Sequence, residues 1–132
     1  MAKAFFDTNV LLYLVSADAR KADQAENLLA EGGCISVQVL NEFAAVATRK
    51  LNMSWPEIDE VLAAVREICS VEPLTMQTHD RAREIAAQSG YSFYDASIIA
   101  AAQLAECTLL YSEDMQAGQR IGKRVIRNPF KS

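Results

Sequence analysis

The sequence has few of the residues on which common enzyme chemistry depends. Its 132 residues include three cysteines, none of them in a Cys-X-X-Cys pair, and one histidine. We interpret Cys34, Cys69 and Cys107 as small buried apolar side chains rather than zinc ligands or disulfide partners. The single histidine, His79, does not favour a nucleophile–histidine–acid triad. The chemistry that remains available is that of carboxylates.

Long apolar segments are also missing. The longest unbroken apolar run, Val10–Val15, has six residues, whereas a membrane-spanning helix needs about 20. The N-terminal segment has one lysine and only a short apolar stretch before Asp7, unlike a secretory signal peptide. No internal repeat and no linker rich in proline or glycine divides the chain. We therefore expect residues 1–132 to form a single domain that lies in the cytoplasm and does not enter a membrane.

Charge is distributed unevenly along the chain. The 13 Lys and Arg residues face 17 Asp and Glu, for a net charge of −4, and every acidic residue lies before position 120. The C-terminal segment is purely basic, and its charged residues are Arg120, Lys123, Arg124, Arg127 and Lys131. Two interpretations stay open, because such residues protect an exposed edge strand and also form surfaces that face phosphate groups.

The apolar pattern predicts strands that alternate with helices along the whole chain. The predicted strands are Ala4–Phe6, Cys34–Ser36, Ser70–Leu74, Cys107–Tyr111 and Val125–Ile126. The predicted helices cover residues 18–31, 37–51 after an N-cap at Ser36, a segment that starts at the capping box Ser54–Glu57, a segment that Thr78 caps and that ends before Gly90, and residues 92–106. This order predicts an α/β fold, namely a three-layer α/β/α sandwich with a mostly parallel central sheet.

Four carboxylates that lie far apart in sequence are expected to meet at one edge of this sheet. Asp7 directly follows the first predicted strand, and Asp114 follows the strand that ends at Tyr111. Asp95 lies in the first turn of its helix, and Glu42 lies in the first half of another helix. Strand C-termini and the following helix N-termini share one edge in a parallel sheet, and ligands bind there. Clustered carboxylates repel unless a cation neutralises them, and oxygen ligands suit Mg²⁺ or Mn²⁺.

Each carboxylate also has a purely structural interpretation. Asp7 fits an Asx turn at the end of a strand, and Glu42 can extend to solvent from the flank of its helix. Asp95 fits a capping box, and Asp114 fits a loop or the cap of a following helix. Glu113 competes with Asp114 as the last acid of the site. These alternatives stay open at the level of sequence.

Four short motifs resemble those of a known family. They are Phe6-Asp7-Thr8-Asn9-Val10-Leu11, Asn41-Glu42, Tyr94-Asp95-Ala96 and Ser112-Glu113-Asp114-Met115. In type and order they resemble the motifs of PIN-domain ribonucleases, and the resemblance covers essentially the whole chain. The small size of the chain is similar to that of VapC toxins from bacterial and archaeal toxin–antitoxin pairs.

The resemblance implies a metal-dependent endoribonuclease that is a homodimer and has a VapB-type antitoxin, whose tail occludes the acidic cleft. By analogy, one or two Mg²⁺ or Mn²⁺ ions would be held by Asp7, Glu42, Asp95 and Asp114. Asn9 and Ser112 would be the polar residues that accompany these acids. Contacts with the RNA backbone are expected from Arg120, Lys123, Arg124 and Arg127. The chain has Ala117 where many relatives have a further Asp, which weakens the expectation of a firmly held second metal.

Other functions remain as alternatives. The chain could be a PIN nuclease of RNA processing without an antitoxin, or a mainly non-catalytic partner in an autoregulatory DNA-binding complex. DNA could replace RNA as the substrate, because carboxylates and a metal do not by themselves recognise the 2′-hydroxyl. A haloacid-dehalogenase-like phosphotransferase fits poorly because Asn9 stands where a second Asp is needed. A response-regulator receiver fits poorly because Lys123 precedes the last strand rather than ending it.

Overall fold

The computed structural model describes residues 3–115, 118–121 and 124–128, with positions 120, 121, 124 and 125 described by their backbone alone. The strands are β1 (Ala4–Phe6), β2 (Gly33–Ser36), β3 (Cys69–Glu72), β4 (Leu109–Tyr111), β5 (Arg120–Ile121) and β6 (Arg124–Arg127). The helices are α1 (Thr8–Tyr13), α2 (Ala19–Ala30), α3 (Val37–Lys50), α4 (Trp55–Ile68), α5 (Met76–Ser89) and α6 (Phe93–Leu104).

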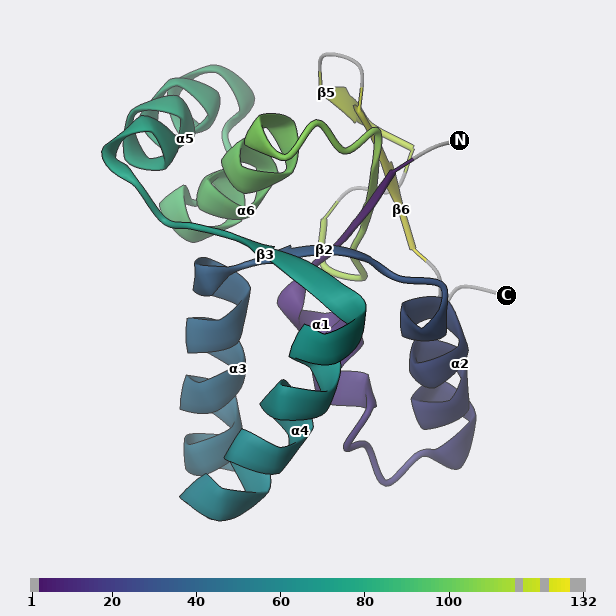
Figure 1. The fold of residues 1–132 in the computed structure, drawn as a ribbon. Helices are drawn as coiled ribbons and strands as arrows, with labels where there is room; N and C mark the ends of the chain where they lie inside the picture. Colours follow the sequence, from purple (N-terminus) through teal and green to yellow (C-terminus); the bar gives the residue numbers. More distant parts are fainter. Residues whose placement is uncertain (1–2, 116–117, 122–123, 129–132) are drawn as a thin grey trace.

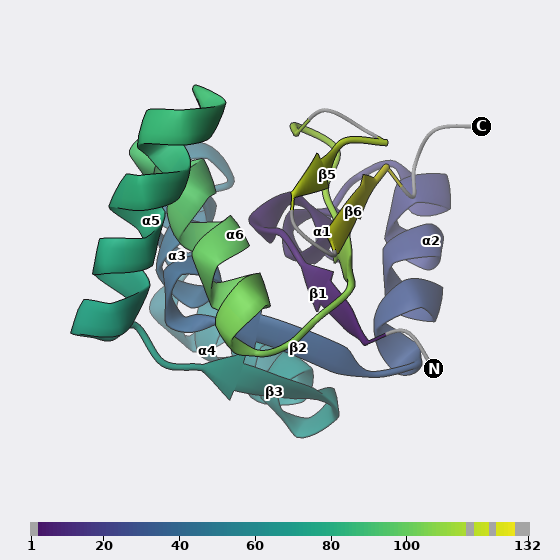
Figure 2. The same ribbon diagram turned by 90° about the horizontal axis from the view of Figure 1, so that it is seen from above.

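The strands form one sheet in the order β3-β2-β1-β4-β6-β5. All neighbouring pairs are parallel except β5 and β6, which are antiparallel. Helices α1 to α4 lie on one side of the sheet and α5 and α6 on the other, as Figures 1 and 2 show. The predicted three-layer α/β/α sandwich with a mostly parallel sheet is therefore confirmed.

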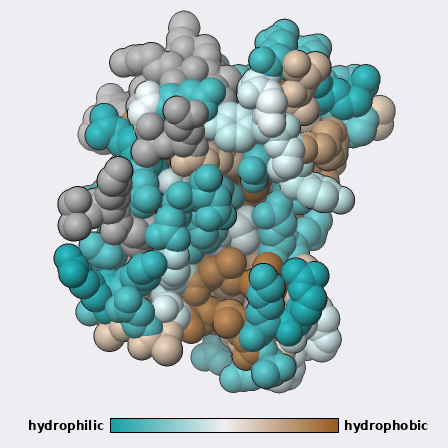
Figure 3. Space-filling model, turned by 180° about the vertical axis from the view of Figure 1, so that it is seen from behind, coloured by the Kyte–Doolittle hydropathy of each residue, from teal (hydrophilic) through white to brown (hydrophobic). Residues whose placement is uncertain are grey.

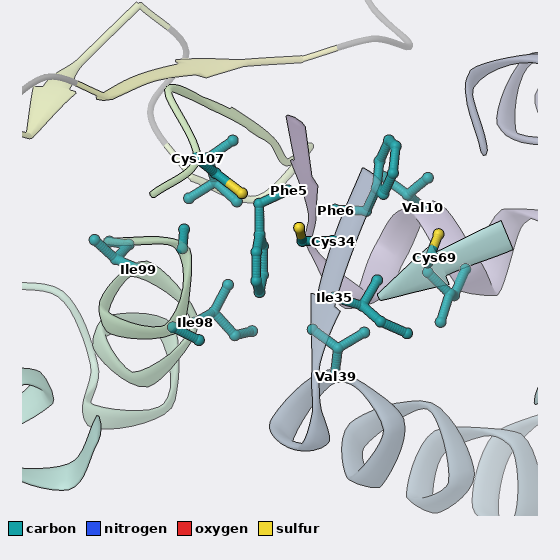
Figure 4. Close-up of a cluster of buried hydrophobic side chains, with 14 of the residues drawn as sticks. Phe5, Phe6, Val10, Cys34, Ile35, Val39, Cys69, Ile98, Ile99 and Cys107 are labelled. Carbon is teal, nitrogen blue, oxygen red and sulfur yellow. The ribbon is translucent and has the colours of Figure 1, made fainter. Parts of the chain in front are cut away.

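The core forms on both faces of the central strand. Phe5 and Phe6 are successive residues of β1, so their side chains leave opposite faces of the sheet, and both are buried. Phe5 points toward Ile98 of α6, and Phe6 lies near Val10 of α1 (Figure 4). Helix α6 is rich in alanine and buried along most of its length, which allows it to lie close to the sheet and to α5. The three cysteines are buried, as predicted.

Most helix starts coincide with the predicted caps, and three elements differ from the predictions. Ser36 caps α3 and Ser54–Glu57 forms the expected capping box. Helix α1 was not predicted, because its continuous apolar run has no helical period. Thr75, not Thr78, caps α5, and Thr78 is the reciprocal partner in that capping box. Strand β5 is also new. No helix of the described residues has both the length and the apolar character to cross a membrane.

Gly33 permits the close approach of β1 and β2. Its φ is +154°, and a Cβ atom there would lie 2.6 Å from Cε2 of the buried Phe6 ring and 2.8 Å from the carbonyl oxygen of Ala4. Gly90 also has a positive φ, of +79°, but a Cβ atom there would meet nothing within 4 Å. A substitution at Gly33 therefore causes both steric overlap and backbone strain, whereas a substitution at Gly90 causes backbone strain alone.

We expect Gly33→Ala to lower the free energy of unfolding by about 3 kcal/mol, because overpacking adds to backbone strain. Gly90→Ala, which carries the strain alone, is expected to cost about 1 kcal/mol. Urea denaturation of both variants and the wild type measures the difference. Equal losses for the two variants would contradict the steric argument.

Candidate active site

Asp7 lies at the point where β1 passes into α1. Its backbone N–H donates to the carbonyl of Tyr111 at 2.9 Å, which continues the pairing of β1 with β4. Its carboxylate Oδ1 accepts from the backbone N–H of Thr8 at 2.7 Å and caps α1. Its Oδ2 accepts from the hydroxyl of Ser112 at 2.7 Å. Asp7 is only 4% exposed, so its carboxylate is fixed in position and largely removed from water.

The burial of Asp7 changes its acidity. Burial raises the pKa of this carboxyl from 3.8 to about 6, although the hydrogen bonds from Ser112 and Thr8 act in the opposite direction. The negative charges of Asp95 and Glu42 raise the pKa further. Asp7 is therefore an anion held in an unfavourable environment, in which a nearby cation would stabilise the charged form.

Glu42 reaches the cluster from α3 and is held at both carboxylate oxygens. Oε1 accepts from the hydroxyl of Thr8 at 3.0 Å, and Oε2 accepts from the side-chain amide of Gln38 at 2.8 Å. Thr8 thereby links Glu42 to the residue next to Asp7. The sequence analysis assigned no role to Gln38, although its position four residues before Glu42 on one helix face is a usable signal.

Asp95 comes from the first turn of α6. The hydroxyl of Ser92 caps this helix by accepting from the backbone N–H of Asp95 at 3.2 Å. Burial raises the pKa of the Asp95 carboxyl, the charge of Asp114 raises it further, and the hydrogen bond with Ser92 lowers it. Asp95 is thus electrostatically coupled both to Asp7 and to Asp114.

The loop after β4 supplies two further residues of the predicted site. Ser112 is fully buried, donates to Asp7 through its hydroxyl, and accepts with the same oxygen from the backbone N–H of Met115 at 3.2 Å. Asn9 accepts from the backbone N–H of Glu113 at 3.4 Å. Its amide nitrogen Nδ2 is buried and has no hydrogen-bond partner among the residues that the structure describes. This amide is a donor that a ligand oxygen can use.

The side chains of Glu113 and Asp114 have different neighbours. The carboxylate of Glu113 accepts a hydrogen bond from the hydroxyl of Tyr13 and lies 3.5 Å from the ammonium of Lys21. Asp114 is exposed and close enough to Asp95 for its charge to raise the pKa of that carboxyl. Of the two competing acids, the structure brings Asp114 to the carboxylate cluster, defined here as Asp7, Glu42, Asp95 and Asp114.

The predicted backbone-binding residues lie on the last two strands or outside the described residues. Arg120 belongs to β5 and Arg124 to β6, while Lys123 lies outside the described residues, as does Ala117. Arg127 is exposed at the end of β6, and its carbonyl accepts from the backbone N–H of Ser112 at 2.8 Å. Because β6 lies between β4 and β5, the edge-strand interpretation does not apply to Arg127.

The donor set of the carboxylate cluster fits a hard divalent cation. It consists of carboxylate oxygens from four different segments, with no imidazole or thiolate nearby among the residues that form it. Within the described residues, no three His, Cys, Asp or Glu side chains are already close enough together to form a compact metal-binding group. Repulsion between like charges opposes a closer approach of the carboxylates.

Fold and cluster together define an α/β protein with an acidic site at the carboxyl edge of a parallel sheet. The family model of the PIN domain matches residues 4–120. The chain therefore belongs to the PIN domain family. No curated protein sequence matches the chain.

Solved structures share this fold at low sequence identity. A toxin–antitoxin complex from Klebsiella pneumoniae has a TM-score of 0.74 at 19% identity, over 98% of this chain and 100% of the other. VapC20 of Mycobacterium tuberculosis, a toxin that cleaves the sarcin–ricin loop, has a TM-score of 0.69 at 24% identity, over 85% and 90% of the two chains. VapBC2 of Rickettsia felis, bound to a DNA fragment of its promoter, has a TM-score of 0.66 at 18% identity, over 95% and 97%.

We expect the buried carboxyl of Asp7 to make the metal-free protein less stable as the pH rises. The folded chain binds this proton more tightly than the unfolded chain does, so the free energy of unfolding falls as the pH rises from about 4 to about 7. The raised pKa corresponds to a loss of about 3 kcal/mol. Asp7→Asn should remove most of this loss, as measured by urea denaturation in EDTA at both pH values.

Asp18→Asn is the matched control for this prediction. Asp18 also caps a helix, α2, but it is exposed, so its replacement reports the loss of a capping carboxylate alone. An Asp7→Asn variant that is less stable than the wild type at neutral pH would contradict the proposed cost of the buried charge.

Proposed function

We propose that this protein is a VapC-type endoribonuclease that hydrolyses RNA phosphodiester bonds with one or two Mg²⁺ or Mn²⁺ ions. The observation that carries the proposal is the electrostatic coupling of the buried Asp7 to Asp95 and Glu42, and of Asp95 to Asp114, in a PIN fold. The fold is shared with VapC20, a toxin that cleaves the sarcin–ricin loop. An oxygen-only site of this kind binds hard cations, and such cations bind phosphate oxygens.

The residues of the site divide into ligands and residues that orient them. Asp7, Glu42, Asp95 and Asp114 would hold the metal directly or through water. A divalent cation at this site supplies a bound water of lowered pKa and shields the negative charge of the phosphate. Ser112 fixes one oxygen of Asp7.

Four further side chains complete this arrangement. Thr8 and Gln38 fix the two oxygens of Glu42. The free amide of Asn9 would donate to a phosphate oxygen or to a water molecule. Arg127, which is exposed beside the loop after β4, would contact the RNA backbone, where contacts position the substrate without reading its sequence.

We also propose an antitoxin partner and a homodimeric state. Two neighbouring grooves of about 560 and 590 Å³ lie among α1 to α4 and share Val15, Met53 and Glu57. Figure 3 shows a hydrophobic area bordered by hydrophilic side chains in this lower half of the molecule. Three acidic side chains, Glu26, Glu57 and Glu60, line the first groove. The apolar floor and acidic border of this groove fit an amphipathic segment of the antitoxin that carries basic residues. The tail of the antitoxin would cover the acidic cleft, which is a different surface. We place this complex in the cytoplasm.

Removal of a carboxylate should strongly reduce the rate of cleavage without loss of the fold. We expect Asp7→Asn and Asp95→Asn each to lower the rate of RNA cleavage by about 100-fold or more, comparable to the loss of a group that stabilises developing charge. Asp59→Asn, which changes an exposed acid of α4, is the matched control and should cleave normally. The assay uses single-stranded and structured RNA with Mg²⁺, Mn²⁺ or EDTA.

Circular dichroism of each variant and calorimetric titration with Mn²⁺ accompany this assay. Cleavage by Asp7→Asn at the rate of the wild type, or cleavage that persists in EDTA, would overturn the assignment of the metal site. Metal binding by the wild type without cleavage of any RNA would retain the site and exclude the proposed substrate.

A further inference from the structure

Three side chains outside the carboxylate cluster contact one another beside it. They are Tyr13 at the end of α1, Lys21 in the first turn of α2, and Glu113 in the loop after β4. The hydroxyl of Tyr13 donates to Oε1 of Glu113, and the ammonium of Lys21 donates to the Tyr13 oxygen at 3.1 Å. Lys21 Nζ also lies 3.5 Å from Oε2 of Glu113 and 4.4 Å from the centroid of the Tyr13 ring. We refer to Tyr13, Lys21 and Glu113 as the clasp.

The clasp differs from an ordinary surface ion pair, which contributes little. The side chains of Lys21 and Glu113 are only 36% and 28% exposed, and both oxygens of Glu113 are engaged. The backbone N–H of Glu113 is bonded as well, to the side chain of Asn9. Burial and the hydrogen bond to Glu113 raise the pKa of Tyr13, and the hydrogen bond from Lys21 lowers it. Glu113 is therefore fixed in one orientation by two helices.

Fixing Glu113 determines where the next residue lies. Ser112 is bonded through its backbone to Arg127 and through its hydroxyl to Asp7, and Met115 is bonded to Ser112. The Asp114 side chain is exposed, and no hydrogen bond fixes it within the described part of the chain. The position of Asp114 beside Asp95 thus depends on how the backbone of its neighbours is held. On the N-terminal side of Asp114, the clasp holds Glu113.

We infer that Tyr13 and Lys21 are positioning residues for Asp114. By holding the Glu113 side chain away from the carboxylate cluster, they orient the loop Ser112–Met115 so that Asp114, rather than Glu113, faces Asp95. The inference deepens the proposed function and rests on it, because the orientation of Asp114 matters for the binding of a metal by the cluster. It also gives these two residues a role that no motif assigns to them.

Hydrogen exchange of the metal-free protein tests the clasp directly. Tyr13→Phe removes the hydroxyl and retains the ring, and Lys21→Met removes the charge and retains the apolar stem. We expect each variant to raise the exchange rates of the Glu113 and Met115 amides by about 10-fold, because local opening becomes easier. The amide of Leu110 in β4 should be unchanged. Lys50→Met, at the end of α3, is the matched control.

Calorimetric titration with Mn²⁺ tests the consequence. We expect Tyr13→Phe and Lys21→Met each to weaken Mn²⁺ binding by about 10-fold, the lower range for residues that orient metal ligands. In the double variant Tyr13→Phe with Glu113→Gln, the loss of Mn²⁺ affinity should be no larger than in either of these two variants alone. Both changes break the same interaction between Tyr13 and Glu113. With RNA as substrate, kcat should fall while KM changes little.

The outcomes separate the inference from the function on which it rests. Unchanged exchange rates in both variants would show that the clasp does not hold the loop. Faster exchange with unchanged Mn²⁺ affinity would overturn the positioning of Asp114, and a raised KM alone would make Lys21 a contact for RNA phosphate instead. A wild-type protein that binds no Mn²⁺ and cleaves no RNA would overturn the proposed function and, with it, the role of the clasp in metal binding.

Discussion

The burial of one carboxylate, Asp7, is the constraint on which the rest of the site depends. A charged group removed from water destabilises the fold unless hydrogen bonds or a cation compensate for the lost hydration. The chain supplies two such bonds, from Thr8 at the start of α1 and from Ser112 in the loop after β4. Each of these donors is itself bonded onward, Thr8 to Glu42 of α3 and Ser112 to Arg127 of β6. One buried anion thereby connects four segments of the chain at the carboxyl edge of the sheet.

Structural and functional interpretations of the acidic residues turn out to be compatible. Asp7 caps a helix and also belongs to the carboxylate cluster, because capping uses one oxygen of the carboxylate and leaves its second oxygen for Ser112. At the start of α6, the N-cap is Ser92, whose hydroxyl accepts from the backbone N–H of Asp95. The carboxylate of Asp95 takes no part in this bond. Helix N-termini also carry partial positive charge, which favours acids there. The preference for acids at helix N-termini therefore favours acidic residues at the edge of the sheet where ligands bind.

The convergence of the carboxylates could be predicted from sequence because it depends on a rule of topology rather than on detail. Parallel strands all end at the same edge of the sheet, so Asp7 after β1 and Asp114 after β4 both lie at that edge, and β1 and β4 are neighbours in the sheet. The identity of the last acid could not be predicted. It depends on Tyr13 and Lys21, which contact Glu113 across about a hundred positions of sequence, and no periodicity or spacing reports a contact of that kind. Helix α1 was missed for the opposite reason, because its uniform apolar run Val10–Val15 carries no period at all.

The same topology separates the basic residues of the C-terminal segment: Arg120 lies on the outer strand β5, where the edge-strand interpretation still applies, and Arg127 lies on the inner strand β6. The body of the protein is acidic, and a polyanion that approaches the carboxylate cluster is repelled by it. Strand β6 pairs with β4 in parallel, with Tyr111 opposite Arg127, and β5 covers the outer side of β6. Arg127 is therefore not a protecting charge on an open edge. It lies exposed at the same end of the sheet as the acids, bonded through its backbone to Ser112. The topology thus places an arginine at the same end of the sheet as the carboxylate cluster, where its positive charge opposes the repulsion that the proposed RNA substrate would meet from the carboxylates.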